Sequence, residues 1–131
     1  PELMLAMAWV ESRYIPTVVS QTRGPRGPMF CGVLQAHVRT TAACSRAAAD
    51  IRGAYVAALE HLGDWERFCR FDKIARKHTD RLGCVLAGYN GGVAAARELR
   101  TRYSSAVRRR AWRLKNGWPP TPPRRSPRAA T

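Results

Sequence analysis

One isolated carboxylate stands in residues 7–16, "MAWVESRYIP", among apolar and aromatic side chains. It is Glu11, and the next acidic residue along the chain is Asp50. Apolar surroundings disfavour the charged form of a carboxyl group and raise its pKa. A carboxyl group that stays protonated near neutral pH can act as a general acid and then, once ionised, as a base. Taken alone, a glutamate near a helix end is more often a solvated surface charge, so its surroundings must decide.

The helix that must position Glu11 is predicted over residues 2–14. Apolar side chains recur there at helical spacing, at Leu3, Met7, Val10 and Tyr14. The helix must end before Pro16, because the residue before a proline avoids the helical conformation. Glu11 then lies in the last turns, where the helix macrodipole also tends to raise the pKa of a carboxylate.

The rest of the chain is predicted to be mostly α-helical, with no strands and no internal repeats. Helical spacing and glycine breaks predict helices over residues 45–62, 64–78, from Asp80 to the break at Gly91 and Gly92, and about 93–114. Gly63 is expected to end the first of these, and Tyr103 belongs to the apolar stripe of the last. Residues 20–32 are rich in glycine and proline and are expected to form a loop.

Positive charge is concentrated at the C-terminal end. Residues 99–131 hold ten of the 23 Lys and Arg, and no acidic residue follows Glu98. We therefore expect one domain over residues 1–107 and a basic, disordered or extended tail over 108–131. Such a tail favours an acidic polymer as partner, namely nucleic acid, anionic lipid or a bacterial wall, although it could serve solubility alone. No segment is long and apolar enough to span a membrane, and we expect no signal peptide.

The four cysteines have none of the close spacings of a zinc site, and the three histidines do not cluster with them. We expect no metal ion and no cofactor. The cysteines are either reduced packing residues or form two disulfides, which we favour, with three possible connectivities. Sequential pairing, Cys31–Cys44 and Cys69–Cys84, would close loops of about 15 residues that each stabilise the fold by roughly 3 kcal/mol. Disulfides would indicate an oxidising compartment.

Four segments carry a family resemblance when they are taken together and in order. They are "ESRYIPTVVS" (11–20), "GVLQAHVRTTA" (32–42), "IRGAYVAAL" (51–59) and "LAGYNGG" (86–92). This set resembles the catalytic domain of lytic transglycosylases, the goose-lysozyme-like SLT family, over about residues 2–100. The family pattern runs E-S-x-[FY]-x-P-x-[AV]-V-S, then G-x-M-Q and T-A, then G-x-x-Y, then A-Y-N-[AG]-G.

This chain departs from the family pattern in a few places. The loop before Gly32 is some six residues longer than usual and could cover a groove or be plain surface. Leu34 stands where methionine is usual, and Tyr55 follows Gly53 one residue early. Gly88 replaces the usual alanine before Tyr89, a change that keeps close packing possible.

The resemblance implies a lysozyme-like helical fold with a groove, and a reaction that needs a single carboxyl group. Glu11 would protonate the bridging oxygen of the MurNAc–GlcNAc link and then act as base towards the C6 hydroxyl, giving a 1,6-anhydromuramic product. The other matched positions would bind substrate: Ser12, Gln35, Tyr55, Tyr89 and Asn90. Tyr89 would also lie against Glu11 and hold its orientation. Without the resemblance, Ser12 would be an ordinary helix residue, Tyr55 part of the apolar core stripe, and Tyr89 and Asn90 part of a turn that ends a helix.

Several alternatives stay open at this stage. The chain could keep the fold as a catalytically silent wall-binding or virion component, or it could be a lysozyme-type hydrolase with Asp50 as base. A nucleic-acid-binding module rests only on the basic tail with Trp112 and Trp118. The expected partner is peptidoglycan, with other virion or envelope proteins. The expected location is the bacterial periplasm and cell envelope, or a phage virion.

Overall fold

The computed structural model describes residues 2–15, 19–21 and 29–117 of the chain. Its elements are α1 (Glu2–Ser12), β1 (Val19–Gln21), β2 (Met29–Cys31), β3 (Ala36–Val38), α2 (Thr41–Ala49), α3 (Ile51–Phe71), the 3-10 helix η1 (Ala75–Lys77), α4 (Arg81–Glu98) and α5 (Arg102–Asn116). The protein is mostly α-helical, as the sequence predicts.

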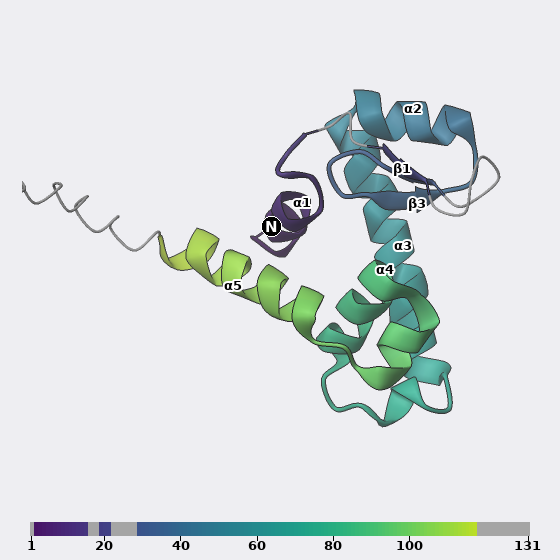
Figure 1. The fold of residues 1–131 in the computed structure, drawn as a ribbon, viewed down its shortest axis with the longest axis vertical. Coiled ribbons are helices and arrows are strands. Elements are labelled where there is room, and N and C mark those ends of the chain that lie inside the picture. Colours follow the sequence, from purple (N-terminus) through teal and green to yellow (C-terminus); the bar gives the residue numbers. More distant parts are fainter. Residues whose placement is uncertain (1, 16–18, 22–28, 118–131) are drawn as a thin grey trace, which may run out of the picture.

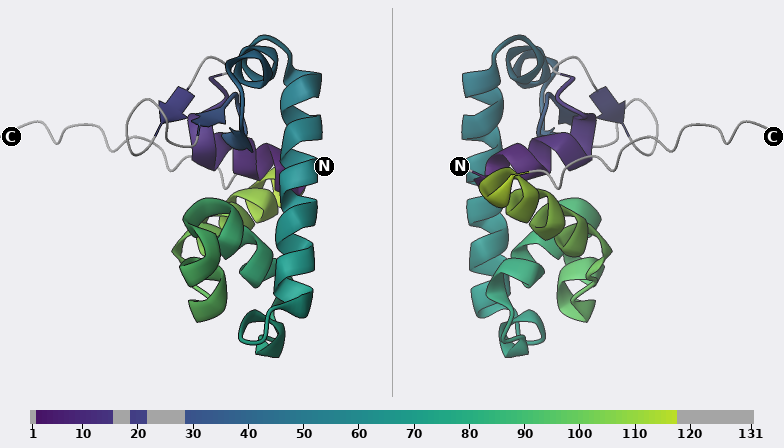
Figure 2. Two further views of the ribbon diagram at one scale, coloured as in Figure 1. Left: turned by 90° about the vertical axis from the view of Figure 1, so that its right-hand side faces the viewer. Right: turned by 90° about the vertical axis from the view of Figure 1, so that its left-hand side faces the viewer.

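Helix α3 is the longest element and forms the spine of the molecule (Figure 1). The small sheet and α2 lie along its N-terminal half, and α4 lies along its C-terminal half (Figure 2). Helices α1 and α5 pack against each other, and both contribute buried side chains to a core shared with α3 and α4. Polar side chains cap three of the helices, because Thr40, Asp50 and Asp80 each accept a hydrogen bond from a backbone N–H of the first turn that follows.

The described strands form a three-stranded antiparallel sheet in the order β1-β2-β3. Phe30 on β2 pairs with His37 on β3, so β3, which lies in the matched segment 32–42, runs beside β2. The prediction of no strands was wrong, because three-residue strands are too short to show an alternating pattern. The middle of the predicted loop, residues 22–28, lies outside the described residues.

The predicted helix boundaries need three corrections. The helix predicted over 45–62 is two helices, because the extended backbone of Asp50 ends α2 and its side chain caps α3. Helix α3 then runs through Gly63 to Phe71, since an interior glycine costs only about 1 kcal/mol relative to alanine. The helix predicted over 93–114 is interrupted at Leu99, whose left-handed backbone, with φ of 52°, ends α4.

The C-terminal part of the chain also differs from expectation. Helix α5 extends to Asn116, so the predicted division between residues 107 and 108 falls inside a helix. Residues 118–131 lie outside the described part of the chain. Of the ten basic residues that follow Glu98, six are within α5: Arg102, Arg108, Arg109, Arg110, Arg113 and Lys115.

Two disulfides hold the elements together, and both follow the sequential pairing. Cys31–Cys44 joins β2 to α2, and Cys69–Cys84 joins α3 to α4. The first disulfide therefore fixes the sheet to α2, and the second fixes α4 to the central helix α3. None of the described helices is long and apolar enough to cross a membrane.

Helices α1 and α5 share the main core with α3 and α4. The largest fully buried side chains there are Met7, Leu34, Leu86 and Val107. At the edge of the same contact, the ring of Trp9 has the guanidinium groups of Arg13 and Arg110 at 4.6 and 4.1 Å from its centroid. Such cation–π contacts attract positive charge to the face of an aromatic ring.

Candidate functional site

Glu11 lies half-buried near the end of α1, in agreement with the predicted position in its last turns. Burial raises the pKa of its carboxyl group from the ordinary value of 4.5 to about 7, and the Tyr103 hydroxyl partly offsets this rise. At neutral pH the protonated and ionised forms are therefore both populated. This is the balance that a group needs if it is to donate a proton and later take one back.

The Tyr103 hydroxyl comes from α5 and is the polar group that approaches Glu11. It is buried and has no well-oriented hydrogen-bond partner among the described residues, but it lies near enough to lower the pKa of the carboxyl group. Burial and the negative charge of Glu11 raise the pKa of Tyr103, so its phenol stays protonated. The sequence placed Tyr103 only on an apolar helical stripe. No local signal marks it as a neighbour of a residue 92 positions away.

Tyr89 lies close to Glu11 but directs its hydroxyl elsewhere. The phenol of Tyr89 donates a hydrogen bond to the carbonyl oxygen of Leu34, at 2.5 Å. Burial, and next the charge of Glu11, raise the pKa of this phenol. The Tyr89 hydroxyl, which was predicted to orient the carboxyl group of Glu11, thus holds the 32–35 turn instead. The hydroxyl that approaches Glu11 belongs to Tyr103.

The turn that carries Gln35 has an unusual backbone. Gln35 has φ of 46°, a left-handed conformation that is uncommon for residues with a side chain. Its side-chain amide donates to the carbonyl oxygen of Gly32 at 3.0 Å, which closes the turn. Gly32 also has positive φ, and a Cβ atom there would lie 2.5 Å from the carbonyl oxygen of Ala47. The glycine of G-x-x-Q therefore has a steric basis, since a side chain at residue 32 would clash with α2, and the spacing allows the Gln35 amide to reach the Gly32 carbonyl oxygen.

A small cleft of about 160 Å³ opens beside Glu11. Its other lining residues come from β2, the turn and α4, and they are Phe30, Gln35, Tyr89 and Asn90. Asn90 is exposed, while Gln35 and Tyr89 are buried. Four of the six predicted site residues thus meet in one cleft. Among the described residues that line it, Glu11 is the only acid. Phe30 is an addition that the sequence did not single out.

The other two predicted site residues lie outside the lining of this cleft. Ser12 is buried, and its hydroxyl is within hydrogen-bonding distance of the carbonyl oxygens of Val33 and Ala8, at 2.8 and 3.0 Å. It links α1 to the turn that carries Gln35. Tyr55 is half-buried against the main core, and its pKa is raised by burial and next by Tyr14. Both positions support the cleft rather than line it.

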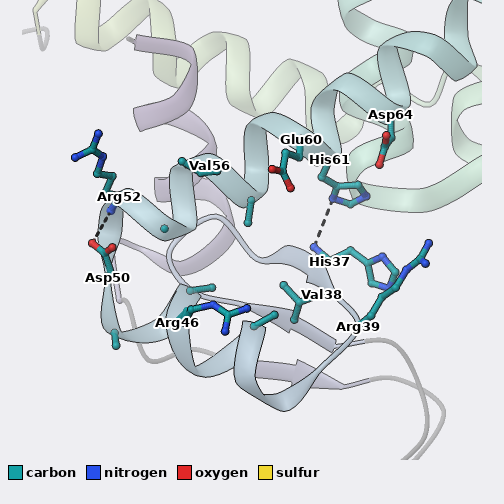
Figure 3. Close-up of a pocket in the computed structure, with 15 residues that line it drawn as sticks. His37, Val38, Arg39, Arg46, Asp50, Arg52, Val56, Glu60, His61 and Asp64 are labelled. Carbon is teal, nitrogen blue, oxygen red and sulfur yellow. Dashed lines mark hydrogen bonds between the residues drawn. The ribbon is translucent and has the colours of Figure 1, made fainter.

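A larger groove of about 750 Å³ lies between β3, α2 and one face of α3 (Figure 3). Asp50, the alternative base predicted for a hydrolase, lines this groove and not the cleft of Glu11. Its Oδ1 atom accepts a hydrogen bond from the backbone N–H of Arg52 at 3.0 Å. Asp50 therefore caps the N-terminus of α3 and lies in the larger groove, away from the cleft of Glu11. Among the described residues, no three His, Cys, Asp or Glu side chains gather as a metal site.

No protein-family model, curated protein or solved structure matches this chain. One carboxyl group with a pKa near 7 faces a cleft that also contains two amide side chains and two aromatic rings. Such a site can protonate an oxygen atom of a bound polar molecule and hydrogen-bond its substituents.

Proposed function

We propose that this protein is a peptidoglycan lytic transglycosylase with a lysozyme-like, goose-type fold. The observation that carries the proposal is the single carboxyl group with a raised pKa in a cleft built from the matched sequence segments. A hydrolytic glycosidase needs two carboxyl groups flanking the bond. A transglycosylase of the kind that the motifs resemble needs only one, so the isolation of Glu11 fits this reaction.

The proposed reaction has two steps at Glu11. In the first, the protonated carboxyl group gives its proton to the bridging glycosidic oxygen as the bond from C1 of MurNAc to that oxygen breaks. The N-acetyl group of the same sugar stabilises the oxocarbenium-like centre that forms. In the second, the C6 hydroxyl attacks C1 and returns its proton to the Glu11 carboxylate. The enzyme is regenerated, and no water is consumed.

The remaining cleft residues have roles that follow from their chemistry. Gln35 and Asn90 carry amide groups suited to sugar hydroxyls and acetamido groups. Phe30 and Tyr89 supply apolar surface for a sugar face. Ser12 and Tyr55 act indirectly, by holding the turn and the core behind the cleft. Tyr103 acts on Glu11, because its hydroxyl favours the ionised carboxylate and so restrains the rise in pKa.

Product analysis tests the proposal against the hydrolase alternative. Purified peptidoglycan treated with the protein should yield fragments that end in 1,6-anhydroMurNAc, about 18 Da lighter than hydrolysed ends because one water is not added. The C6 hydroxyl is favoured as acceptor, since it is held in the same sugar ring as the reacting carbon. Dominant reducing-end MurNAc would identify a hydrolase instead, and the absence of cleavage would favour a silent wall-binding component.

A wall-cleaving enzyme of this kind would work in the bacterial envelope or as part of a phage virion. Two disulfides among the described residues agree with an oxidising compartment or an extracellular particle. The strong positive charge favours association with an anionic wall. Peptidoglycan glycan strands are the proposed partner in either setting.

A further inference from the structure

The larger groove beside α3 has walls of opposite charge. Glu60 and Asp64 lie on α3 on one side, and Arg39 and Arg46 lie on the other, after β3 and on α2 (Figure 3). Asp50 and Arg52 lie together at one end of the groove, where α3 begins, and contribute one charge of each sign. No ion pair joins these two walls among the described residues, although Asp64 pairs with Arg67 on its own helix. The opposite charges are therefore held apart by the groove. A ligand that complements both walls must itself carry both signs of charge.

The surface between the charged walls consists of small, apolar residues. Val38, Ala43, Ala47 and Ala57 line it together with Gly53. The lining positions of α3 run from Arg52 to Asp64 along one helical face, a length of about 18 Å at 1.5 Å per residue. An extended peptide covers about 3.3 Å per residue, so this length fits about five residues with small side chains.

The groove adjoins the cleft of Glu11 through a layer of rings. His37 and His61 line the groove, and their rings lie 5.5 Å from Phe30 and 4.8 Å from Tyr89, both of which line the cleft. Trp65 Nε1 donates a hydrogen bond to His61 Nε2 at 3.0 Å, which fixes that ring. A polymer whose backbone occupies the cleft could therefore place a side branch in the groove.

We propose that this groove binds the short zwitterionic peptide carried by the muramic acid residues of peptidoglycan. The ammonium group of the peptide faces Glu60 and Asp64, its carboxylates face Arg39 and Arg46, and its small side chains contact the apolar lining. The proposal rests on the proposed function for the identity of the branched polymer. It assigns the enzyme a preference for glycan strands that still carry their peptides.

Binding of the free peptide tests the groove without any glycan. The tetrapeptide L-Ala-γ-D-Glu-L-Lys-D-Ala, titrated into the full chain by calorimetry, should bind at millimolar concentration or below. Arg46→Gln and Glu60→Gln should each weaken binding about tenfold or more, since each removes one charge-assisted hydrogen bond. Arg76→Gln on η1 is the matched control and should bind like the wild type, because Arg76 lines neither hollow. No binding, or equal binding by all variants, would overturn the proposal.

Cleavage assays separate this proposal from the proposed function. Glycan strands with their peptides and strands stripped of them are compared as substrates. The two groove variants should lose activity only on peptide-bearing strands, and their side chains are exposed, so the core stays intact. Equal loss on both substrates would contradict a peptide site while leaving glycan cleavage established. If no glycan is cleaved, the proposed function fails, and the calorimetry still decides whether the groove binds the peptide.

Discussion

Glu11 combines burial, a raised pKa and one nearby phenol. This environment lowers the stability of the folded protein at neutral pH and makes the carboxyl group able to exchange a proton there. The folded protein holds the proton on Glu11 more tightly than the unfolded chain does. Between the ordinary pKa of 4.5 and the folded value of about 7, folding therefore becomes less favourable as pH rises. A residue kept at this cost is typical of a functional site rather than of a structural one.

Replacing Glu11 by glutamine should separate these two effects. The amide keeps the shape of the side chain but cannot donate and recover a proton, so lytic activity should fall by about two to four orders of magnitude. Unfolding at pH 8 should show the variant more stable than the wild type by about 1–3 kcal/mol, because no buried carboxylate remains. Glu98→Gln is a control at an exposed site. Near wild-type lysis by the Glu11 variant would remove the site assignment.

Tyr103 should set the upper pH limit of activity. Its hydroxyl lowers the pKa of Glu11, so Tyr103→Phe should raise that pKa and move the alkaline fall of kcat/KM to higher pH. Stability should change little, since the hydroxyl has no well-oriented partner among the described residues. The measurement is the pH profile of cleavage by both proteins. An unmoved alkaline limb would show that Tyr103 does not act on Glu11.

At the scale of elements, the packing of α4 on α3 explains a departure in the sequence. Gly88 stands where the resembled family has alanine, and a Cβ atom there would lie 2.3 Å from Cε3 of Trp65 on α3. Trp65 in turn holds His61 through its indole N–H. The glycine is therefore required by the tryptophan, and the two residues together position the ring layer beside the cleft.

A pair of glycine substitutions tests this packing. Gly88→Ala should destabilise the protein by about 1–3 kcal/mol, because either Trp65 or the α4 backbone must move. Gly63→Ala is the matched control on α3, where nothing lies within 4 Å of the added Cβ atom. It should stabilise the protein by about 0.5–1 kcal/mol through helix propensity alone. Urea unfolding of both variants would reveal the expected opposite signs, and a gain in stability for Gly88→Ala would contradict the packing argument.

At the scale of the whole molecule, the positive charge is carried by a helix as much as by the chain end. Six of the ten basic residues after Glu98 lie in α5, which packs on the helix of Glu11. The end of the molecule that carries the acid therefore also carries much of the charge that would attract an anionic wall. This arrangement differs from the predicted picture of a core domain followed by a separate basic tail.

The two sources of charge can be compared by their effect on wall association. Truncation after Gly117 removes three arginines, and it should weaken association mainly at low salt, because exposed charges are screened over about 10 Å at 0.1 M. Replacing Arg109 and Lys115 of α5 by glutamine should have an effect of similar size. Cosedimentation with wall material across a salt series measures both. Cleavage of short soluble glycans should barely change in either protein, and its loss on truncation would make residues 118–131 part of the catalytic fold.

The sequence by itself determined the features that depend on local spacing. The helical period placed Glu11 at the end of a helix, and glycine and asparagine near residues 89–92 predicted the break that the positive φ of Gly92 produces in α4. The ordered motifs also selected Gln35, Tyr89 and Asn90, which do meet Glu11 in one cleft. These inferences held because periodicity and turn chemistry act within a few residues.

The tertiary structure alone decided the contacts between distant parts of the chain. It brought Tyr103 to Glu11, directed the Tyr89 phenol to Leu34 and assigned the Ser12 hydroxyl to backbone carbonyls. It also selected one disulfide connectivity from three. Such contacts depend on how helices far apart in the sequence pack together, and residues of one type occur at many positions with the same local pattern. No local rule distinguishes the tyrosine that reaches the acid from one that only fills the core.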